Sequence, residues 1–168
     1  GRLSSLMDIR TKDGNNQRFT GTGGLGLISS RLTLEGPIGS DRATFLVSGR
    51  RTYADLFLKL SNDKDIRDNT LYFYDLNAKV NYRIRDNYRI YIAGYFGKDN
   101  FSTRFAGMDF GNSTVTARWN PIFSPKLFSD FTLLGSFYNY RLNTDLSEQI
   151  KAEWKSKMND YGFKADFS

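Results

Sequence analysis

Apolar and polar side chains alternate along much of this chain, most clearly between residues 72 and 84. Every even-numbered position there is apolar or aromatic, from Tyr72 to Ile84. The odd-numbered positions from residue 75 onward carry Asp75, Asn77, Lys79, Asn81 and Arg83. Successive side chains of a β-strand point to opposite faces, so this period of two predicts a strand with one apolar and one polar face.

The same period predicts a series of strands. Residues 88–96 alternate in this way and follow the short segment Arg85–Asn87, which predicts an antiparallel hairpin. Further strands are predicted at Thr44–Phe57, Thr114–Asn120, Asp130–Tyr138 and Tyr161–Ser168. The fold class that follows is all-β, an antiparallel up-and-down meander.

The phase of the alternation changes within Phe19–Glu35, where apolar positions are odd-numbered up to Leu27 and even-numbered from Ile28 onward. A single strand contains such a change only at a bulge. Two interpretations follow: a tight hairpin near Leu27–Ser30 that joins two short strands, or one bulged strand. A similar change of phase is expected late in the chain, within Met158–Tyr161.

The predicted connections differ in length on the two sides of the sheet. The short ones are Gly36–Asp41, Arg85–Asn87 and Asn120–Lys126, and the longer, polar ones are Leu58–Asn69, Lys98–Phe110 and Asn143–Ser147. Short turns on one side and long loops on the other are typical of outer-membrane β-barrels. Aromatic residues cluster near the predicted strand ends, as in the aromatic girdles of such barrels, although aromatics favour strands in any sheet.

Composition narrows the function classes. The chain contains neither cysteine nor histidine, which excludes disulfides, thiol chemistry, and the commonest general base and metal ligand. The formal charge of +6 is spread along the chain rather than clustered, so no nucleic-acid partner is expected. No apolar run approaches the roughly 18 residues of a membrane helix, but barrel strands alternate and contain no such run. We therefore expect no enzyme and no cofactor or metal.

Two short motifs resemble ligand-binding loops only superficially. Asp13–Asn15 has the wrong acidic spacing for a calcium loop and predicts a turn. The glycines between Gly21 and Gly26 lack the following Lys-Ser/Thr and the helix of a phosphate-binding loop. Glycines in tightly packed, strongly curved strands explain them better.

The polar side of the strands supplies the candidate functional residues. Arg50 and Arg51 are adjacent in a predicted strand, so they point to opposite faces. One arginine is expected to face a polar lumen and the other a headgroup or loop. The lumen- or plug-facing candidates are Asp75, Asn77, Lys79, Asn81 and Arg50. We identify no acid pair suited to hydrolytic catalysis.

Several segments, in order along nearly the whole chain, resemble one family, the TonB-dependent outer-membrane receptors. GRLSS (residues 1–5) and MDIRTKDG (residues 7–14) are similar to the end of that family's plug domain. LTLEGPI (residues 32–38) and FLVSGRRTY (residues 45–53) are similar to its first inner turn and third barrel strand. YFYDLNAKVNY (residues 72–82) and IAGYFGKD (residues 92–99) are similar to its next hairpin.

The resemblance implies a domain division and a function. Residues 1–13 would be the last strand of the plug domain, and residues 14–168 about eight strands from the N-terminal part of a transmembrane β-barrel of about twenty-two strands. The family's layout favours the hairpin near Leu27–Ser30. A complete receptor lies in the cell outer membrane and, driven by the TonB complex, imports a scarce solute such as a siderophore-iron complex, a corrinoid or a glycan. The expected partners are outer-membrane lipid, the plug and the remaining barrel, and TonB through an N-terminal part absent from this chain.

Two other architectures fit the same pattern. A small complete eight-stranded outer-membrane barrel fits the length of 168 residues. Against it, Gly1 is not a start methionine and the last predicted strand reads as still in progress, so we expect an excerpt of a longer chain. In a soluble ligand-binding β-barrel the apolar faces would point inward. In water, the excerpt is expected to aggregate or oligomerise through its open edges and apolar face.

Overall fold

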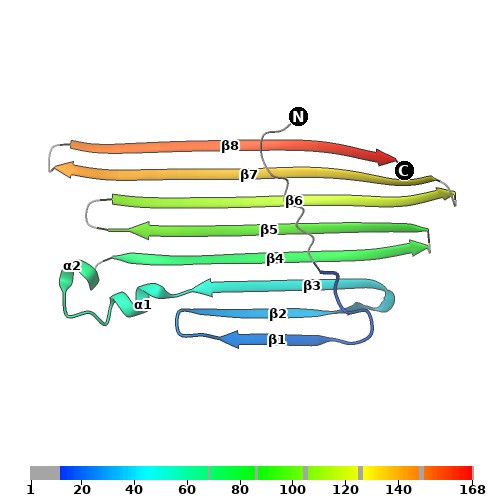
Figure 1. Cartoon of the computed structure of the whole chain (residues 1–168), viewed down its shortest axis with the longest axis horizontal. Coiled ribbons are helices and arrows are strands. Elements are labelled where there is room, and N and C mark those ends of the chain that lie inside the picture. The colour runs from blue at the N-terminus through cyan, green and yellow to red at the C-terminus, as the bar shows by residue number, and fades with distance from the viewer. Residues whose placement is uncertain are drawn as a thin grey trace.

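The computed structural model describes residues 12–67, 69–85, 87–103, 106–124, 127–147 and 150–167. These residues form one antiparallel sheet of eight strands in sequence order (Figure 1). The strands are β1 (Thr20–Leu25), β2 (Ser29–Ile38), β3 (Ser40–Thr52), β4 (Thr70–Arg85), β5 (Tyr88–Ser102), β6 (Ala106–Ser124), β7 (Leu127–Ser147) and β8 (Ile150–Phe167). Two short helices, α1 (Ala54–Leu58) and α2 (Lys64–Arg67), lie between β3 and β4. The all-β antiparallel meander is confirmed.

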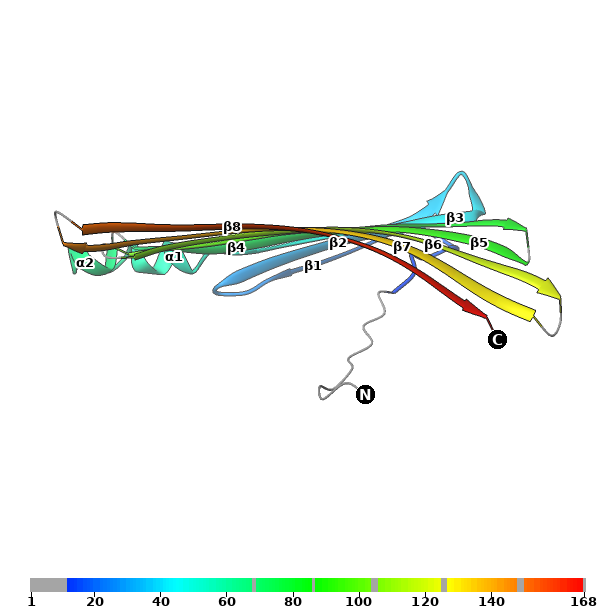
Figure 2. The same ribbon diagram turned by 90° about the horizontal axis from the view of Figure 1, so that it is seen from above.

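The sheet is a single layer with two open edges. β1 and β8 are the first and last strands of the order and do not pair with each other. Figure 2 shows the strands edge on as one layer. Among the described residues no hydrophobic side chain is buried. The sheet is therefore held by its ladder hydrogen bonds and cross-strand pairs rather than by a core.

The register assigns every strand residue to one of two faces. Ala78 lies opposite Val47 of β3 and Gly94 of β5, and paired residues share a face. The apolar face carries the even-numbered residues of β2, β4 and β5 and, across the continuous parts of the register, the odd-numbered residues of β1, β3, β6, β7 and β8. The alternate residues form the polar face.

The hairpin interpretation of Phe19–Glu35 is confirmed. β1 and β2 pair from Thr20 with Glu35 to Leu25 with Ser30. The reversal lies at residues 26–28, where the Gly26 N–H donates to the Ser29 carbonyl over 2.8 Å. The change of phase thus marks a turn and not a bulge.

The connections differ from the prediction at one end of the sheet. We call the end where β1–β2, β3–β4, β5–β6 and β7–β8 are joined the loop end, at the left in Figure 1, and the opposite end the turn end. The predicted loops Lys98–Phe110 and Asn143–Ser147 are wrong in extent, because β5 continues to Ser102, β6 begins at Ala106 and β7 continues to Ser147. Only the β3–β4 connection, residues 53–69, is long, and it contains α1 and α2.

Three smaller predictions also have the wrong bounds. The predicted strand Thr44–Phe57 ends at Thr52, because the apolar residues of α1 follow one another without alternation. The turn between β2 and β3 is centred on Gly39 (φ 70°) and is shorter than the predicted turn Gly36–Asp41, because β2 extends to Ile38 and β3 begins at Ser40. β6 continues to Ser124 through the predicted turn at Asn120–Lys126.

The expected change of phase within Met158–Tyr161 does not occur. β8 pairs with β7 in continuous register there, with Met158 opposite Tyr138 and Tyr161 opposite Gly135. Met158 therefore lies on the polar face and Tyr161 on the apolar face. Met158 is an apolar residue on the polar face, so it interrupts the alternation in the sequence although the pairing of β8 is regular.

Candidate functional site

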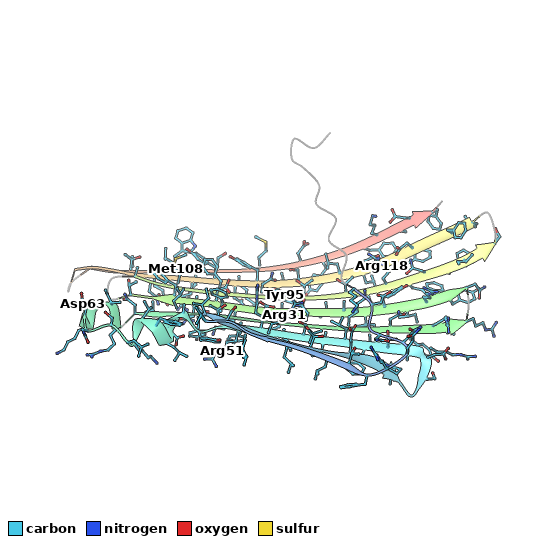
Figure 3. All side chains as sticks on the ribbon, turned by 60° about the horizontal axis from the view of Figure 1, so that its bottom comes forward. Arg31, Arg51, Asp63, Tyr95, Met108 and Arg118 are labelled. Carbon is cyan, nitrogen blue, oxygen red and sulfur yellow. The ribbon has the colours of Figure 1, made fainter. Side chains whose placement is uncertain are left out.

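The polar face brings the predicted candidates of β3 and β4 onto one surface. Arg50 lies opposite Asp75, and its Nε and Nη2 atoms each lie 2.8 Å from Asp75 Oδ2. The other candidates follow along β4 on the same face: Asn77, Lys79 and Asn81. The polar face also carries Arg31, Tyr95 and Arg118, labelled in Figure 3. The five candidates thus form a continuous polar ladder across two neighbouring strands.

Arg50 and Arg51 point to opposite faces, as their adjacency in the strand predicts. Arg51 lies opposite Tyr74 on the apolar face near the loop end. Figure 3 labels it below the sheet, away from Arg31 and Tyr95. An arginine at this position is close to where the apolar face gives way to polar side chains.

The segment that leads into β1 lies against the polar face. Lys12 Nζ is 2.7 Å from Glu35 Oε1 of β2, and Asp13 Oδ1 is 2.6 Å from Lys79 Nζ of β4. Gly14 passes so close to β3 that a Cβ there would clash with the Phe45 carbonyl oxygen. The segment therefore crosses three strands on the polar side before the chain enters the edge strand β1.

This segment also defines a hollow beside the ladder. Lys12, Arg31, Glu35, Ser48 and Asn77 are among the residues around a space of about 610 Å³ on the polar face. Glu35 is only 8 % exposed, which is low for a carboxylate on an open sheet, and its partner Lys12 supplies the compensating charge. Of the predicted plug segment 1–13, residues 1–11 lie outside the described residues, and residues 12 and 13 are not in a strand.

Aromatic side chains gather on the polar face towards the loop end. The Phe110 ring centroid lies 4.8 Å from that of Tyr140 and 6.5 Å from that of Tyr138. Met108 and the 67 % exposed Trp154 share this face. Exposed rings beside polar groups suit contact with the flat apolar face of a small molecule.

The apolar face carries a belt of apolar residues between two aromatic rims. The turn-end rim joins Trp119 to Phe131 with 5.4 Å between ring centroids. The loop-end rim includes the contacts Tyr74–Phe96 at 6.0 Å and Phe137–Tyr161 at 5.8 Å. Exposed aliphatic residues fill the space between the rims: Leu76, Val80, Ile92, Val115 and Leu133. We call this surface the apolar belt.

The belt has the length of a membrane-crossing strand. On β4 it extends from Tyr74 to Tyr82, and on β5 from Tyr88 to Phe96. Each of these stretches holds about nine residues, and a transmembrane β-strand needs about 9–11. Aromatic rims of this kind mark the two interfaces of barrels that span a bilayer.

The aromatic clusters seen in the sequence divide between the faces. The rims account for Tyr74, Tyr82, Tyr88, Trp119 and Phe137, whereas the register places Phe73, Tyr91, Tyr138 and Tyr140 on the polar face. Position in the sequence near a strand end did not separate the two groups. The two groups differ in whether the residue occupies an odd-numbered or an even-numbered position of its strand.

Sequence reasoning missed the contacts of Lys12, Asp13 and Glu35. No local pattern could reveal them, because Lys12 lies 23 residues before Glu35, and Glu35 and Lys79 belong to different strands, β2 and β4. Among the described residues there is no group of acidic side chains that could hold a metal ion, and no helix is long and apolar enough to cross a membrane. Comparisons with protein families, curated proteins and solved structures found no match.

Proposed function

We propose that this chain is the first part of the β-barrel of a TonB-dependent outer-membrane receptor, which imports a scarce solute without chemical conversion. The single observation that carries the proposal is the two-faced sheet: an apolar belt between aromatic rims on one face and charged ladders on the other. The belt would face lipid and the polar face would line the lumen around the plug.

The segment before β1 supports the orientation of the two faces. In a barrel that surrounds a plug, the chain must pass from the inside of the barrel into its first strand. Lys12 and Asp13 pair with Glu35 and Lys79 on the polar face, which is the face that would be inside. The candidates Asp75, Asn77, Lys79, Asn81 and Arg50 would then face the plug or the lumen.

The aromatic group on the polar face supports a place for the solute. Phe110, Tyr138 and Tyr140 lie towards the loop end, which would be the extracellular end in the proposed receptor. Rings there could hold an arriving siderophore-iron complex, corrinoid or glycan before it passes the plug. Aromatic rings can contact a sugar ring, a corrin ring or an aromatic ring of a siderophore, so these residues do not favour one of the three solute classes.

No observation favours either of the two alternative architectures. A closed eight-stranded barrel needs β1 to pair with β8, and these strands lie at opposite edges of the described sheet. A soluble barrel needs its apolar side chains to form a core, and those of the belt are exposed, with Leu133 at 58 %.

The proposal is tested in two steps with the intact protein that carries this chain. Membranes from expressing cells are extracted with urea at alkaline pH, and we expect the protein to remain with the outer-membrane fraction. Uptake of radiolabelled ferric siderophore, corrinoid and oligosaccharide is then measured with and without TonB. Release by urea would contradict the membrane assignment, and uptake of none of the three, or uptake that persists without TonB, would contradict the transport assignment.

A further inference from the structure

Charged side chains continue along the apolar face beyond the loop-end rim. On β5, Lys98 follows Phe96. On β7, Arg141 lies four residues beyond Phe137 on the same face, directly opposite Lys155 of β8. Lys157 comes next to Lys155 on this face of β8. These residues lie on the face that carries the belt and not on the face that carries the polar ladder.

The cluster is asymmetric in two respects. Among the side chains that the structure describes here, the four cations Lys98, Arg141, Lys155 and Lys157 outnumber the two carboxylates Asp109 and Glu153. Next to the turn-end rim, the residues of this face on β6, β7 and β8 are Pro121, Ser129 and Phe167, with no charge, whereas next to the loop-end rim they are Gly111, Asn139 and Lys157. On these three strands, the described basic residues of this face therefore lie only at the loop end.

The two carboxylates form ion pairs with three of the four cations, and the cluster keeps a net positive charge. Lys98 Nζ lies 3.4 Å from Asp109 Oδ2, and Glu153 lies 2.8 Å from Lys155 Nζ and 3.8 Å from Arg141 Nε. The Arg141 and Lys155 side chains remain 56 % and 57 % exposed. The carboxylates thus order the cations while leaving them accessible to an external anion.

We infer that Arg141, Lys155 and Lys157 form a binding site for the phosphate groups of a membrane lipid. This inference rests on the proposed function, because the belt must lie in a bilayer for these residues to reach its headgroups. Basic residues at the edge of an apolar span place their charge at the level of lipid phosphates while the belt contacts the acyl chains. In the proposed receptor the loop end is extracellular, so the lipid would be the phosphorylated glycolipid of the outer leaflet.

Lipid A is the probe for this site. The intact protein is purified in a neutral detergent, and lipid A binding is followed by native mass spectrometry during a titration. The triple variant R141Q/K155Q/K157Q is expected to bind about tenfold or more weakly, since each basic residue near an anionic surface contributes several-fold in affinity. The control variant K164Q removes a cation of β8 from the polar face and is expected to bind as the original protein does.

A second variant tests the site by strengthening it. Glu153→Gln removes a carboxylate that competes for Arg141 and Lys155, so we expect tighter lipid A binding. Equal affinity of the original protein, the triple variant and E153Q would overturn the inference, as would an equal loss in K164Q. If the protein stays in urea-washed membranes but shows that equality, only this inference fails; release of the protein by urea would remove the proposed function as well.

Discussion

Gly14 lies at the point where the segment before β1 passes closest to a strand. A Cβ atom there would meet the Phe45 carbonyl oxygen, which belongs to the backbone of β3 and cannot rotate away. The neighbouring ion pairs, Lys12–Glu35 and Asp13–Lys79, hold the segment against the same region. Glycine is therefore required by close approach of two backbones and not by an unusual turn.

Gly14→Ala is expected to destabilise the intact protein by about 1–3 kcal/mol, the usual cost of overpacking. Gly24→Ala is the matched control, because nothing lies within 4 Å of a Cβ at Gly24. The free energy of unfolding in detergent, from denaturant titration, distinguishes the two. Equal stability of G14A and G24A would contradict the close contact.

At the scale of the element, the strands are predictable where one face is apolar. β4 and the start of β5 followed directly from the period of two, and the β1–β2 hairpin followed from its change of phase. The ladder residues of β4 fell on one face for the same reason. Alternation is visible because lipid or a core requires apolar residues at every second position.

Prediction failed where the apolar face of a strand carries polar side chains. Asn100 and Asp109 lie on the apolar side of β5 and β6, but beyond the loop-end rim, so their neighbours alternate no longer. Such segments resemble loops in composition, yet the backbone pairing of β5 and β6 continues through them. The Asn100 side-chain amide also donates to the Asp109 carboxylate over 3.1 Å. The contacts of residues 12 and 13 also escaped prediction, because they depend on the register of β2 and β4.

If the apolar belt lies in a membrane, a charged side chain within it should destabilise the protein more than one beyond the rim. Leu133→Arg places a charge within the belt on β7, and we expect it to destabilise folding into lipid vesicles by about 2–4 kcal/mol. Asn139→Arg, on the same face and strand beyond the rim, is expected to have an effect below about 1 kcal/mol. Both variants are compared by denaturant titration in vesicles.

In water the two substitutions would not differ in this way. Leu133 is already 58 % exposed in this sheet, so an arginine there would remain solvated. Equal effects of L133R and N139R would therefore contradict the assignment of the belt to lipid. Thr132→Arg, on the polar face next to Leu133, is a second control that should be tolerated.

At the scale of the whole molecule, the described sheet lacks the features that make a β-protein stable in water. It has no buried hydrophobic side chain among the described residues, and the strands β1 and β8 leave two unpaired edges. A sheet of this kind requires another surface along each edge and over its apolar face. In the proposed receptor, further barrel strands would cover the edges and lipid would cover the belt.

In the function that we propose, the apolar face contacts lipid and the polar face contacts water or the plug. The chain contains no cysteine, so single cysteines can be introduced one at a time into the intact protein in its membrane. The apolar set is Leu76, Val80, Ile90 and Phe131, and the polar set is Asn77, Asn81 and Thr132. Each is treated with a lipid-soluble and a water-soluble thiol reagent.

We expect the apolar set to react only with the lipid-soluble reagent and the polar set to react with the water-soluble one. The two sets alternate along the same strands, so differences in local folding cannot imitate this pattern. Protection of the apolar set from both reagents would place these side chains in an internal core and contradict the account.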